Sequence, residues 1–519
     1  MKVAVYDRYW ATGGGGEKFA AGIAAALAAE HDVTLLAHEA VDLAWLGERL
    51  HVDLSGVAVE QVDGHAAAAV GRATAAFDLF VNASYRSNDL NRARRGVYVV
   101  HFPGVRPSGV HRAWGRITAV TSDLLAPRGV EVSLGDGFYG PEWARRYSLN
   151  WTGGDADLRV LSQQDGRVAV TLYLGRYVPA AVGPLTATAE VGGQAVGHAV
   201  VTAPRSRWDW RKVVPLAFAL DLTAGEPLTV TLRSPGWVPS EHGLGADHRC
   251  LGVPLLGWQV GRGARAWLAR RAPLLVSRTE SLDFLDSYDQ ILANSRYTQG
   301  WIDRMWHRPS RVLYPPVTLM PRGAERKLIL SVGRFFTPGS GHNKKQLEMV
   351  RAFRRLVAGG QAEGWEYHLV GGCSPEHRGY LDQVRAEAAG LPVVLHPDAS
   401  GAELRDLYGQ AAIFWHAAGL DENAEQHPDR AEHFGITTVE AMSSGAVPVV
   451  IDAGGQAEIV EQGVSGYRFR TVDDLVRCTH RLVADPSLRQ AMSTAAEHRA
   501  QSFGWEAFAA NARRELVGP

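Results

Sequence analysis

Several features that would mark a secreted, membrane-spanning or nucleic-acid-binding protein are missing from this sequence of 519 residues. Its three cysteines, at positions 250, 373 and 478, are too far apart for a disulfide framework or a CxxC metal site, which indicates a reducing, cytoplasmic compartment. No apolar run approaches the roughly 20 residues of a membrane span, and the first residues lack the long apolar stretch of a signal peptide. The 54 basic and 55 acidic residues nearly cancel, so the basic excess of a DNA or RNA binder is also lacking.

Lysine is scarce as well, since it provides only 6 of the 54 basic residues. Two of the six, Lys344 and Lys345, are adjacent in a chain whose default cation is arginine. The apolar fraction of 46% and the charged fraction of 21% are ordinary for a soluble globular enzyme. At about 150 residues per domain, the length predicts three or four domains.

The first third of the chain has an α/β pattern. A short apolar strand at 3–6 leads into a glycine cluster at 13–16, an alanine-rich helix over 17–29 and a second strand at 33–36. This order is a βαβ unit and predicts a parallel sheet. Further strands are expected at 79–82 and 97–101.

The pattern changes near residue 130, where short alternating segments replace helices. Apolar residues alternate with polar ones over 167–174 and 227–233, and turn clusters separate such segments. This is typical of a sandwich or small barrel, so we expect a separate all-β, sandwich-like domain over 130–261. Because α/β pattern returns after it, the β-domain is predicted to be inserted in the first α/β domain.

The last third alternates regularly between strands and helices. Strands are expected at 328–332, 366–370, 393–396, 412–416 and 447–451, and helices near 344–357, 402–410, 436–444 and 472–484. That order predicts a second doubly wound domain. The expected domains are therefore an N-terminal Rossmann-like domain over 1–129 and 262–318, the inserted β-domain, a C-terminal Rossmann-like domain over 319–500, and a C-terminal helix over 501–519 that packs back toward the first domain.

Two segments carry candidate chemistry. Backbone N–H groups of the glycine run at 13–16 could hold an anion before a helix, although neither a P-loop nor a dinucleotide fingerprint is present and a plain flexible turn is the alternative. The stronger signal is EHFGITTVEAMSSGAVPVV at 432–450, where Glu432 and Glu440 flank the start of a helix opened by Gly435. One carboxylate can accept both hydroxyls of a ribose, and a helix N-terminus favours phosphate; the alternative is a surface carboxylate pair with helix capping.

The segment at 432–450 resembles the E-x7-E signature of the family 4 retaining glycosyltransferases, which have the GT-B fold. Further segments resemble the family in the same order along the chain. They are GGGGEK with Gly14 and Gly15, YVVHFP with His101, ILANSRYTQGWI and LYPPV before the interdomain linker, SVGRFF with Arg334, KKQLEMVRAF with Lys344 and DAGGQAEIV with Gly454 and Gly455.

The resemblance implies a GT-B fold, in which two Rossmann-like domains face a cleft, and a nucleotide-diphospho-sugar donor carrying GDP or UDP. It implies a retaining hexosyltransferase, for example a mannosyltransferase, that needs no cofactor or metal and acts on a glycan or lipid-linked acceptor in cell-surface polysaccharide or glycolipid assembly. Arg334 and Lys344 would then stabilise the leaving diphosphate, since charge builds on its oxygens. Glu432 would hold the sugar hydroxyls, Glu440 the ribose, and His101 would reach the transferring sugar.

Several assignments stay open at this level. The segment before Lys344 is longer than the usual family loop, so Lys345 is an alternative diphosphate ligand, and His416 either lines the cleft or packs in the core. The DAD sequence at 155–157 is expected to be a turn rather than a metal site. Basic patches at 91–95 and 265–271 could contact anionic lipid at a membrane surface or be solvated faces.

Two other functions are compatible with the sequence. A nucleotide-sugar epimerase or a phosphorylase also uses the GT-B architecture, although a phosphorylase needs a cofactor-bearing lysine that this lysine-poor chain offers only at 327, 344 and 345 in its C-terminal domain. A carbohydrate-binding protein could instead use tryptophan faces of the β-domain, such as Trp208, Trp210 or Trp237, to stack on sugar rings, although tryptophan is more often a core residue. No nucleic-acid partner is expected.

Overall fold

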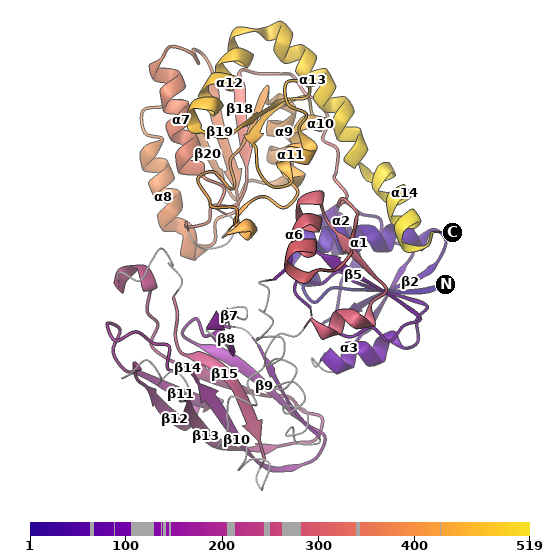
Figure 1. Cartoon of the computed structure of the whole chain (residues 1–519), viewed down its shortest axis with the longest axis vertical. Helices are drawn as coiled ribbons and strands as arrows, with labels where there is room; N and C mark the ends of the chain where they lie inside the picture. Colours follow the sequence, from indigo (N-terminus) through magenta and orange to yellow (C-terminus); the bar gives the residue numbers. More distant parts are fainter. Residues whose placement is uncertain are drawn as a thin grey trace. The chain divides into compact units, whose positions relative to one another are not determined.

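The computed structural model describes residues 1–62, 67–87, 89–104, 129–135, 137–138, 142–144, 147–204, 213–242, 250–261, 282–338, 343–425 and 427–518. The chain divides into two compact units (Figure 1). One unit comprises Met1–Val105 together with Phe284–Pro519, and the other comprises Arg106–Asp283. The second unit thus extends on both sides beyond the 130–261 that the sequence pattern delimits.

The first unit begins with a seven-stranded parallel sheet in the order β17-β16-β5-β4-β1-β2-β3. Its strands are β1 (Lys2–Tyr6), β2 (Asp32–Ala37), β3 (Val57–Gln61), β4 (Leu79–Asn82), β5 (Arg95–Val100), β16 (Gln290–Ala293) and β17 (Arg311–Val312). The chain leaves this sheet after β5 and returns to it as β16, which pairs directly with β5. The expected α/β fold with a parallel sheet is therefore confirmed for the N-terminal domain.

Among the described residues of this domain, the helices are α1 (Gly15–Ala28), α2 (Leu43–Leu50), α3 (Ala67–Thr74) and α6 (Arg296–Trp306). Small side chains let α1 pack closely, and its Phe19 and Ile23 are buried against the sheet. The last helix of the chain, α14 (Trp505–Leu516), packs on α1 through Phe508. A Cβ on Gly22 of α1 would lie 2.7 Å from Pro316 Cγ and 3.1 Å from Phe508 Cε1, so this contact requires glycine.

A second parallel sheet of six strands, in the order β20-β19-β18-β21-β22-β23, forms the C-terminal α/β domain. Its strands are β18 (Leu328–Val332), β19 (Glu366–Gly371), β20 (Val393–Pro397), β21 (Ile413–His416), β22 (Val447–Ile451) and β23 (Tyr467–Phe469). The helices are α7 (Gln346–Ala358), α8 (Arg378–Glu387), α9 (Gly401–Gln410), α10 (Ile436–Ser443), α11 (Gln456–Ile459), α12 (Val472–Ala484) and α13 (Pro486–Ala500) (Figure 1). The strand order reverses between β18 and β21, the point where ligands bind in open α/β sheets.

The described residues of the second unit form two five-stranded antiparallel sheets, β13-β10-β15-β8-β7 and β12-β11-β14-β9-β6. The strands are β6 (Val130–Leu134), β7 (Glu142–Ala144), β8 (Tyr147–Trp151), β9 (Ala156–Ser162), β10 (Gly166–Leu174), β11 (Leu185–Val191), β12 (Gln194–Val201), β13 (Val214–Leu222), β14 (Leu228–Arg233) and β15 (Pro254–Val260). Alternate residues of both sheets share one apolar core, which is the arrangement of a sandwich.

Of the two roles that the sequence leaves open for Trp237, a sugar-stacking face or the core, the structure shows the core. Trp237 is not a surface platform for sugars, because it is 7% exposed, its indole N–H donates to Gly252 O at 3.1 Å, and its ring meets Trp151 edge-on. Trp208 and Trp210 lie outside the described residues. The DAD carboxylates contact the neighbouring strand, with Asp155 paired to Arg233 and Asp157 accepting from Thr231 at 2.8 Å.

Candidate functional site

The carboxyl ends of three neighbouring strands bring candidate residues together in the C-terminal domain. His416 ends β21, Arg334 follows β18 and the glycine turn at Gly454 follows β22. All three therefore lie at the edge of the sheet where the strand order reverses.

Glu432 is the centre of the most concentrated charged cluster at this edge. Its Oε2 contacts the Lys344 ammonium and accepts from His416 Nε2 at 3.0 Å. The side chains of Glu432 and Lys344 are each 20% exposed, whereas His416 is buried. Burial lowers the pKa of His416, against the opposing effect of its hydrogen bond to Glu432. A neutral imidazole thus donates one N–H to the carboxylate, and the Lys344 ammonium pairs with the same oxygen.

The two adjacent lysines diverge. Lys345 is the N-cap of α7 with φ +60°, and its ammonium lies 2.7 Å from Glu422 Oε1 rather than beside Glu432. The stem of Lys344 passes over the end of β18, where a Cβ on Gly333 would lie only 2.6 Å from Lys344 Cγ. The two lysines that the sequence offered as diphosphate ligands therefore have different partners in the acidic loop at 421–432. Lys344 faces Glu432, and Lys345 faces Glu422.

Glu440 lies on α10 and faces partners different from those of Glu432. Its Oε2 accepts a hydrogen bond from the buried Tyr408 hydroxyl of α9 at 2.8 Å. Burial raises the pKa of Glu440, while the charge of Lys18 and the Tyr408 hydrogen bond oppose that rise. Lys18 belongs to α1 of the N-terminal domain, and nothing in the sequence pattern pointed to it.

The glycines at 435, 454 and 455 allow two loops to pack backbone against backbone. A Cβ on Gly454, which has φ +62°, would lie 2.2 Å from Glu432 O, and Gly455 N donates to that same oxygen at 2.8 Å. A Cβ on Gly435 would lie 2.5 Å from the amide nitrogen of Gln456. These glycines therefore fix the main chain that carries Glu432 in front of the α10 N-terminus.

Gln456 is a residue of this site that sequence reasoning missed. It is fully buried beside Gly435, and neither its amide oxygen nor its nitrogen has a hydrogen-bond partner among the described residues. Buried amides normally find a partner. Together with the N-terminus of α10, Gln456 thus adds polar groups suited to an anionic ligand.

The glycine loop of the N-terminal domain lies against the C-terminal domain. A Cβ on Gly14 would lie 3.8 Å from an Arg334 guanidinium nitrogen, and one on Gly15 would lie 3.6 Å from Ile436 Cδ1. The Glu17 carboxylate accepts from Gly14 N at 2.6 Å and so holds the loop at the start of α1. The structure thus brings Gly14 and Gly15 close to the residues that flank the α10 N-terminus.

His101 follows β5 and lies next to the same loop, 3.6 Å from where a Cβ on Gly16 would be. Its Nε2 donates to Ala83 O at 2.8 Å, so the unprotonated nitrogen of a neutral ring is Nδ1. Burial lowers the pKa of His101, which favours that neutral form. His101 is therefore arranged to accept a hydrogen bond rather than to carry a charge.

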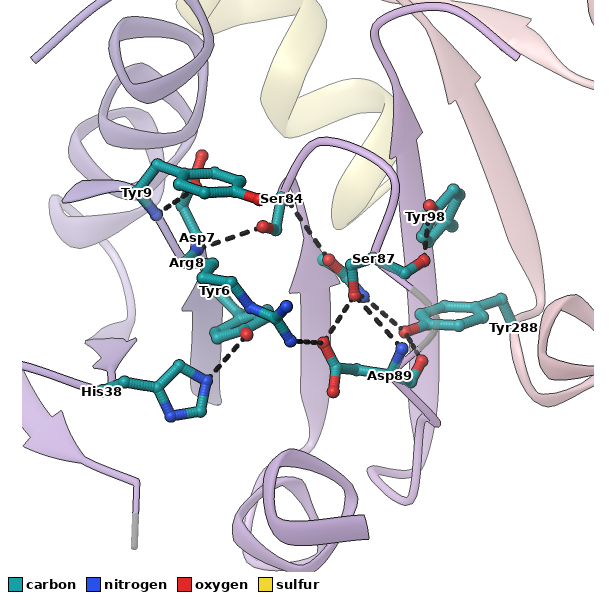
Figure 2. A network of polar contacts seen from close by, with 11 residues as sticks. Tyr6, Asp7, Arg8, Tyr9, His38, Ser84, Ser87, Asp89, Tyr98 and Tyr288 are labelled. Atoms are coloured by element: carbon teal, nitrogen blue, oxygen red, sulfur yellow. Dashed lines mark hydrogen bonds and ion pairs between the residues drawn. The ribbon is translucent and has the colours of Figure 1, made fainter. Parts of the chain in front are cut away.

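A buried polar network supports the carboxyl ends of β1 and β4 (Figure 2). Arg8 lies 3.9 Å from the buried carboxylate of Asp89, which also accepts from Ser87 at 2.6 Å. Tyr6 and His38 are hydrogen-bonded at 2.9 Å on the other side of Arg8. Asp7 is 1% exposed, and burial raises its pKa to about 7. The network was not apparent from sequence, because its members come from separated segments.

Arginines of the basic patch at 91–95 contact neighbouring segments of the protein. In the patch at 91–95, Arg95 donates to Leu516 O at 2.8 Å and Arg94 pairs with Asp78 at 3.5 Å, while the patch at 265–271 lies outside the described residues. Within the described ranges no helix combines the length and apolarity needed to cross a membrane. The same residues contain no group of three or more His, Cys, Asp or Glu side chains placed to hold a metal ion.

Comparison with known families identifies relatives of the C-terminal domain. Residues 321–499 match the model of the family described as "Glycosyl transferases group 1". The D-inositol 3-phosphate glycosyltransferase of Streptomyces bingchenggensis is 30% identical over 148 residues, which are 27% of this chain and 30% of that protein. The alpha-1,3/1,6-mannosyltransferase ALG2 of Rhizomucor pusillus is 25% identical over 217 residues, which are 34% of this chain and 46% of that protein. The chain thus matches less than half the length of either relative.

Solved structures show that the fold is shared more widely. Anabaena Alr3699/HepE in complex with UDP and glucose aligns over 100% of both chains with a TM-score of 0.51 and 13% identity. Sucrose-phosphate synthase (tll1590) from Thermosynechococcus elongatus aligns over 100% of this chain and 99% of its own with a TM-score of 0.50 and 12% identity. The protein therefore has the GT-B fold of glycosyltransferases, and its C-terminal domain matches their group 1 family.

Proposed function

We propose that this protein is a retaining glycosyltransferase that moves a hexosyl group from a nucleotide-diphospho-sugar to a glycan or lipid-linked acceptor. The observation that carries the proposal is the contact of Glu432 with Lys344 and His416 at the point where the strand order of the group 1 domain reverses. A carboxylate, a cation and a neutral imidazole are thus held together at the place where open α/β sheets bind their ligands.

The donor class is supported by what the similar proteins bind or use. The Anabaena structure contains UDP and glucose, and a similar Dictyostelium discoideum protein, 24% identical over 214 residues, is a GDP-Man-dependent alpha-1,2-mannosyltransferase. We therefore propose a UDP- or GDP-linked hexose as donor. The Dictyostelium protein acts on a dolichyl-diphosphate-linked glycan, which supports a lipid-linked acceptor for this protein.

The negative charge that develops on the diphosphate during sugar transfer determines the roles of the basic residues. The bond between the anomeric carbon and the diphosphate oxygen breaks, and a bond to an acceptor hydroxyl oxygen forms. The hydroxyl proton passes to the departing diphosphate, on which negative charge builds as the first bond breaks. Arg334 and Lys344 would offset this charge, and one preorganised donor of this kind is worth about 10²–10³ in kcat. The N-terminus of α10 adds a partial positive charge at the same place.

The sugar would be held from both domains. Glu432 would accept hydroxyl hydrogen bonds from the donor sugar, and its negative charge would stabilise positive charge that develops on the ring. His101 would accept another hydroxyl through Nδ1, since its Nε2 is committed to Ala83 O. Glu440, further along α10, would accept the two ribose hydroxyls.

The test is to incubate the purified protein with UDP- and GDP-hexoses, with and without glycan and lipid-linked acceptors, and to identify the products by mass spectrometry and NMR. We expect acceptor-dependent release of nucleoside diphosphate and a glycoside with the anomeric configuration of the donor. Glu432→Gln should abolish transfer, whereas Glu425→Gln, which alters a side chain that is 80% exposed in the same acidic loop, should not. An epimerised nucleotide-sugar without glycoside would establish the epimerase alternative, and an inverted product would refute retention.

A further inference from the structure

The segment at 428–433, which carries Glu432, is contacted from the N-terminal domain by Tyr297 of α6. The Tyr297 hydroxyl donates to Pro428 O at 2.8 Å, although the two residues are 131 positions apart in the sequence. Ala431 N also approaches this carbonyl, but at 3.4 Å, so the tyrosine makes the shorter hydrogen bond. Burial raises the pKa of Tyr297 to about 12, and the hydroxyl therefore remains a donor at neutral pH.

The ring of Tyr297 reaches the other end of the same segment through Phe102. The two rings are stacked, with centroids 6.0 Å apart and planes inclined by 30°, and Phe102 in turn stacks on the imidazole of His433. One side chain thus supports the segment on both sides of Glu432, directly at its start and through Phe102 at its end.

Tyr297 is itself held in place by neighbours in both α/β domains. It lies half-buried in the first turn of α6, and its backbone N–H donates to Glu458 Oε1 at 2.7 Å. Its ring meets Trp301, one turn further along the helix, edge-on with centroids 6.3 Å apart. A side chain that is anchored in this way can hold a functional group precisely, because its own position is fixed by packing and hydrogen bonds.

The C-terminal domain holds the same segment through its main chain. Gly455 N donates to Glu432 O at 2.8 Å, and the Glu432 carboxylate contacts Lys344 and His416. The backbone that carries this carboxylate is therefore held by groups from both α/β domains. Small displacements of such a group matter, since a shift of about 1 Å at a reacting centre can cost roughly 100-fold in rate.

We propose that Tyr297 is a positioning residue by which the N-terminal domain places Glu432 against the hydroxyls of the donor hexose. This inference rests on the proposed function, in which Glu432 accepts those hydroxyls. It adds that recognition of the sugar depends on a tyrosine outside the matched family segment at 321–499. Tyr297 would not touch the sugar; it acts through the segment at 428–433.

The two parts of the donor should respond differently to a change at Tyr297. The nucleoside diphosphate is assigned to Arg334, Lys344 and Glu440, which lie outside the segment at 428–433. Loss of the Tyr297 hydroxyl should therefore leave the affinity for the free nucleotide unchanged and reduce the additional affinity that the hexose provides. A tyrosine that only packs between the domains would change both affinities by the same factor.

The experiment measures Kd by calorimetry for UDP, GDP, UDP-glucose, UDP-galactose and GDP-mannose. Tyr297→Phe removes the hydroxyl and keeps the ring, whereas Tyr297→Leu removes both, and each is made in the wild type and in Glu432→Gln. Tyr467→Phe, which removes the hydroxyl of a buried tyrosine on β23, is the matched control. Melting temperatures establish which variants fold, and Tyr297→Phe alone decides if Tyr297→Leu does not.

We expect Tyr297→Phe to weaken binding of the tightest-bound sugar nucleotide by about 2- to 10-fold, the scale of one hydrogen bond, with no change for the matching free nucleotide. Tyr297→Leu should weaken it further, because the stack with Phe102 is lost as well. In Glu432→Gln neither change should weaken binding any more, since the carboxylate that Tyr297 positions is gone. Tyr467→Phe should alter neither Kd.

The inference alone is overturned if Tyr297→Phe weakens the free nucleotide and the sugar nucleotide equally, leaves both unchanged, or retains its full effect in Glu432→Gln. A different result would count against the proposed function itself. If Glu432→Gln binds the sugar nucleotide like the wild type, or if the wild type binds none of the five ligands, the donor site fails and the role of Tyr297 fails with it.

Discussion

The ring of Phe102 lies nearly flat on the imidazole of His433, with centroids 4.2 Å apart and planes inclined by 15°. Phe102 follows His101 at the end of β5, and His433 follows Glu432 in the other α/β domain. Two candidate sugar-binding residues that are remote in sequence are therefore linked through their immediate neighbours. The stack therefore joins the two segments that carry His101 and Glu432.

This contact leads to a prediction for Phe102→Leu, which keeps an apolar side chain but removes the flat ring. An aromatic pair contributes about 0.5–1.5 kcal/mol, so kcat for sugar transfer should fall by about 2- to 10-fold while nucleotide Kd remains nearly unchanged. Steady-state kinetics and calorimetry on the same preparation check this. Phe102→Tyr, which retains the ring, is the control. A changed Kd with unaltered kcat would contradict this role of the stack.

Alanine substitutions of the two lysines before α7 should differ sharply in their effect on kcat. Lys344→Ala removes the cation that contacts Glu432 and should lower kcat by about 10²–10³. Lys345→Ala removes the partner of Glu422, which Arg430 also contacts at 3.0 Å, and should have a much smaller effect. Initial rates of nucleoside diphosphate release decide between them. If Lys345→Ala is the more damaging change, the assignment of the diphosphate ligand is reversed.

Asp7 should make stability depend on pH. Burial raises its pKa to about 7 from 3.8, so the folded protein keeps a proton that the unfolded chain releases. The free energy of unfolding should consequently fall as the pH rises from about 4 to about 7, by an amount of the order of a few kcal/mol. Asp7→Asn should make the free energy of unfolding less dependent on pH. Relative to the wild type, this variant should therefore be more stable at pH 8 than at pH 4.

Urea unfolding at several pH values measures the effect of Asp7. Asp32→Asn, at an exposed aspartate at the start of β2, controls for the loss of a negative charge alone. If Asp7→Asn and the wild type keep parallel pH profiles, the Asp7 carboxyl is ionised in the folded protein despite its burial.

The β-sandwich unit should be dispensable for binding the nucleotide. Every candidate donor residue lies in the other unit, so replacing 132–259 by a short Gly/Ser linker should leave nucleotide Kd nearly unchanged and lower transfer to the natural acceptor. Both quantities are measured on the same variant after circular dichroism shows that it folds. A folded variant without nucleotide affinity would mean that the unit shapes the donor site.

The sequence was sufficient to predict strands and helices where a local pattern of residues determines the structure. Strands 79–82, 328–332 and 447–451 coincide with the observed ones because they are continuous apolar runs, as buried parallel strands require. The helix over 472–484 also coincides, since Thr471 and Asp474 form a capping box at its start. The helix expected from residue 17 begins at Gly15 instead, because the Glu17 carboxylate accepts from the N–H of the N-cap Gly14 and so fixes the helix start ahead of two glycines, which are poor helix formers.

The sequence was insufficient to predict the candidate site where that site depends on contacts between remote segments. The spacing from Glu432 to Glu440 is visible in one helix start, but the hydrogen bond from Tyr408 of α9 to Glu440 depends on how two helices pack together. The difference between Lys344 and Lys345 comes from a left-handed backbone at Lys345, which no count of residues reveals. The sequence also left Trp237 open between a sugar-stacking face and the core, because a β-sandwich buries alternate residues and composition alone does not identify the buried side.

The start of α6 depends on both α/β domains. Ser295 satisfies the N–H of Thr298, while the carboxylate of Glu458 on α11 accepts from Arg296 N at 2.9 Å and Tyr297 N at 2.7 Å. The first turn of α6 is thus capped by a side chain from the other domain, and separation of the domains would return two amides to water. Hydrogen exchange at Arg296 and Tyr297 consequently provides an internal gauge of domain separation, which can be followed on and off substrate without attaching any probe to the protein.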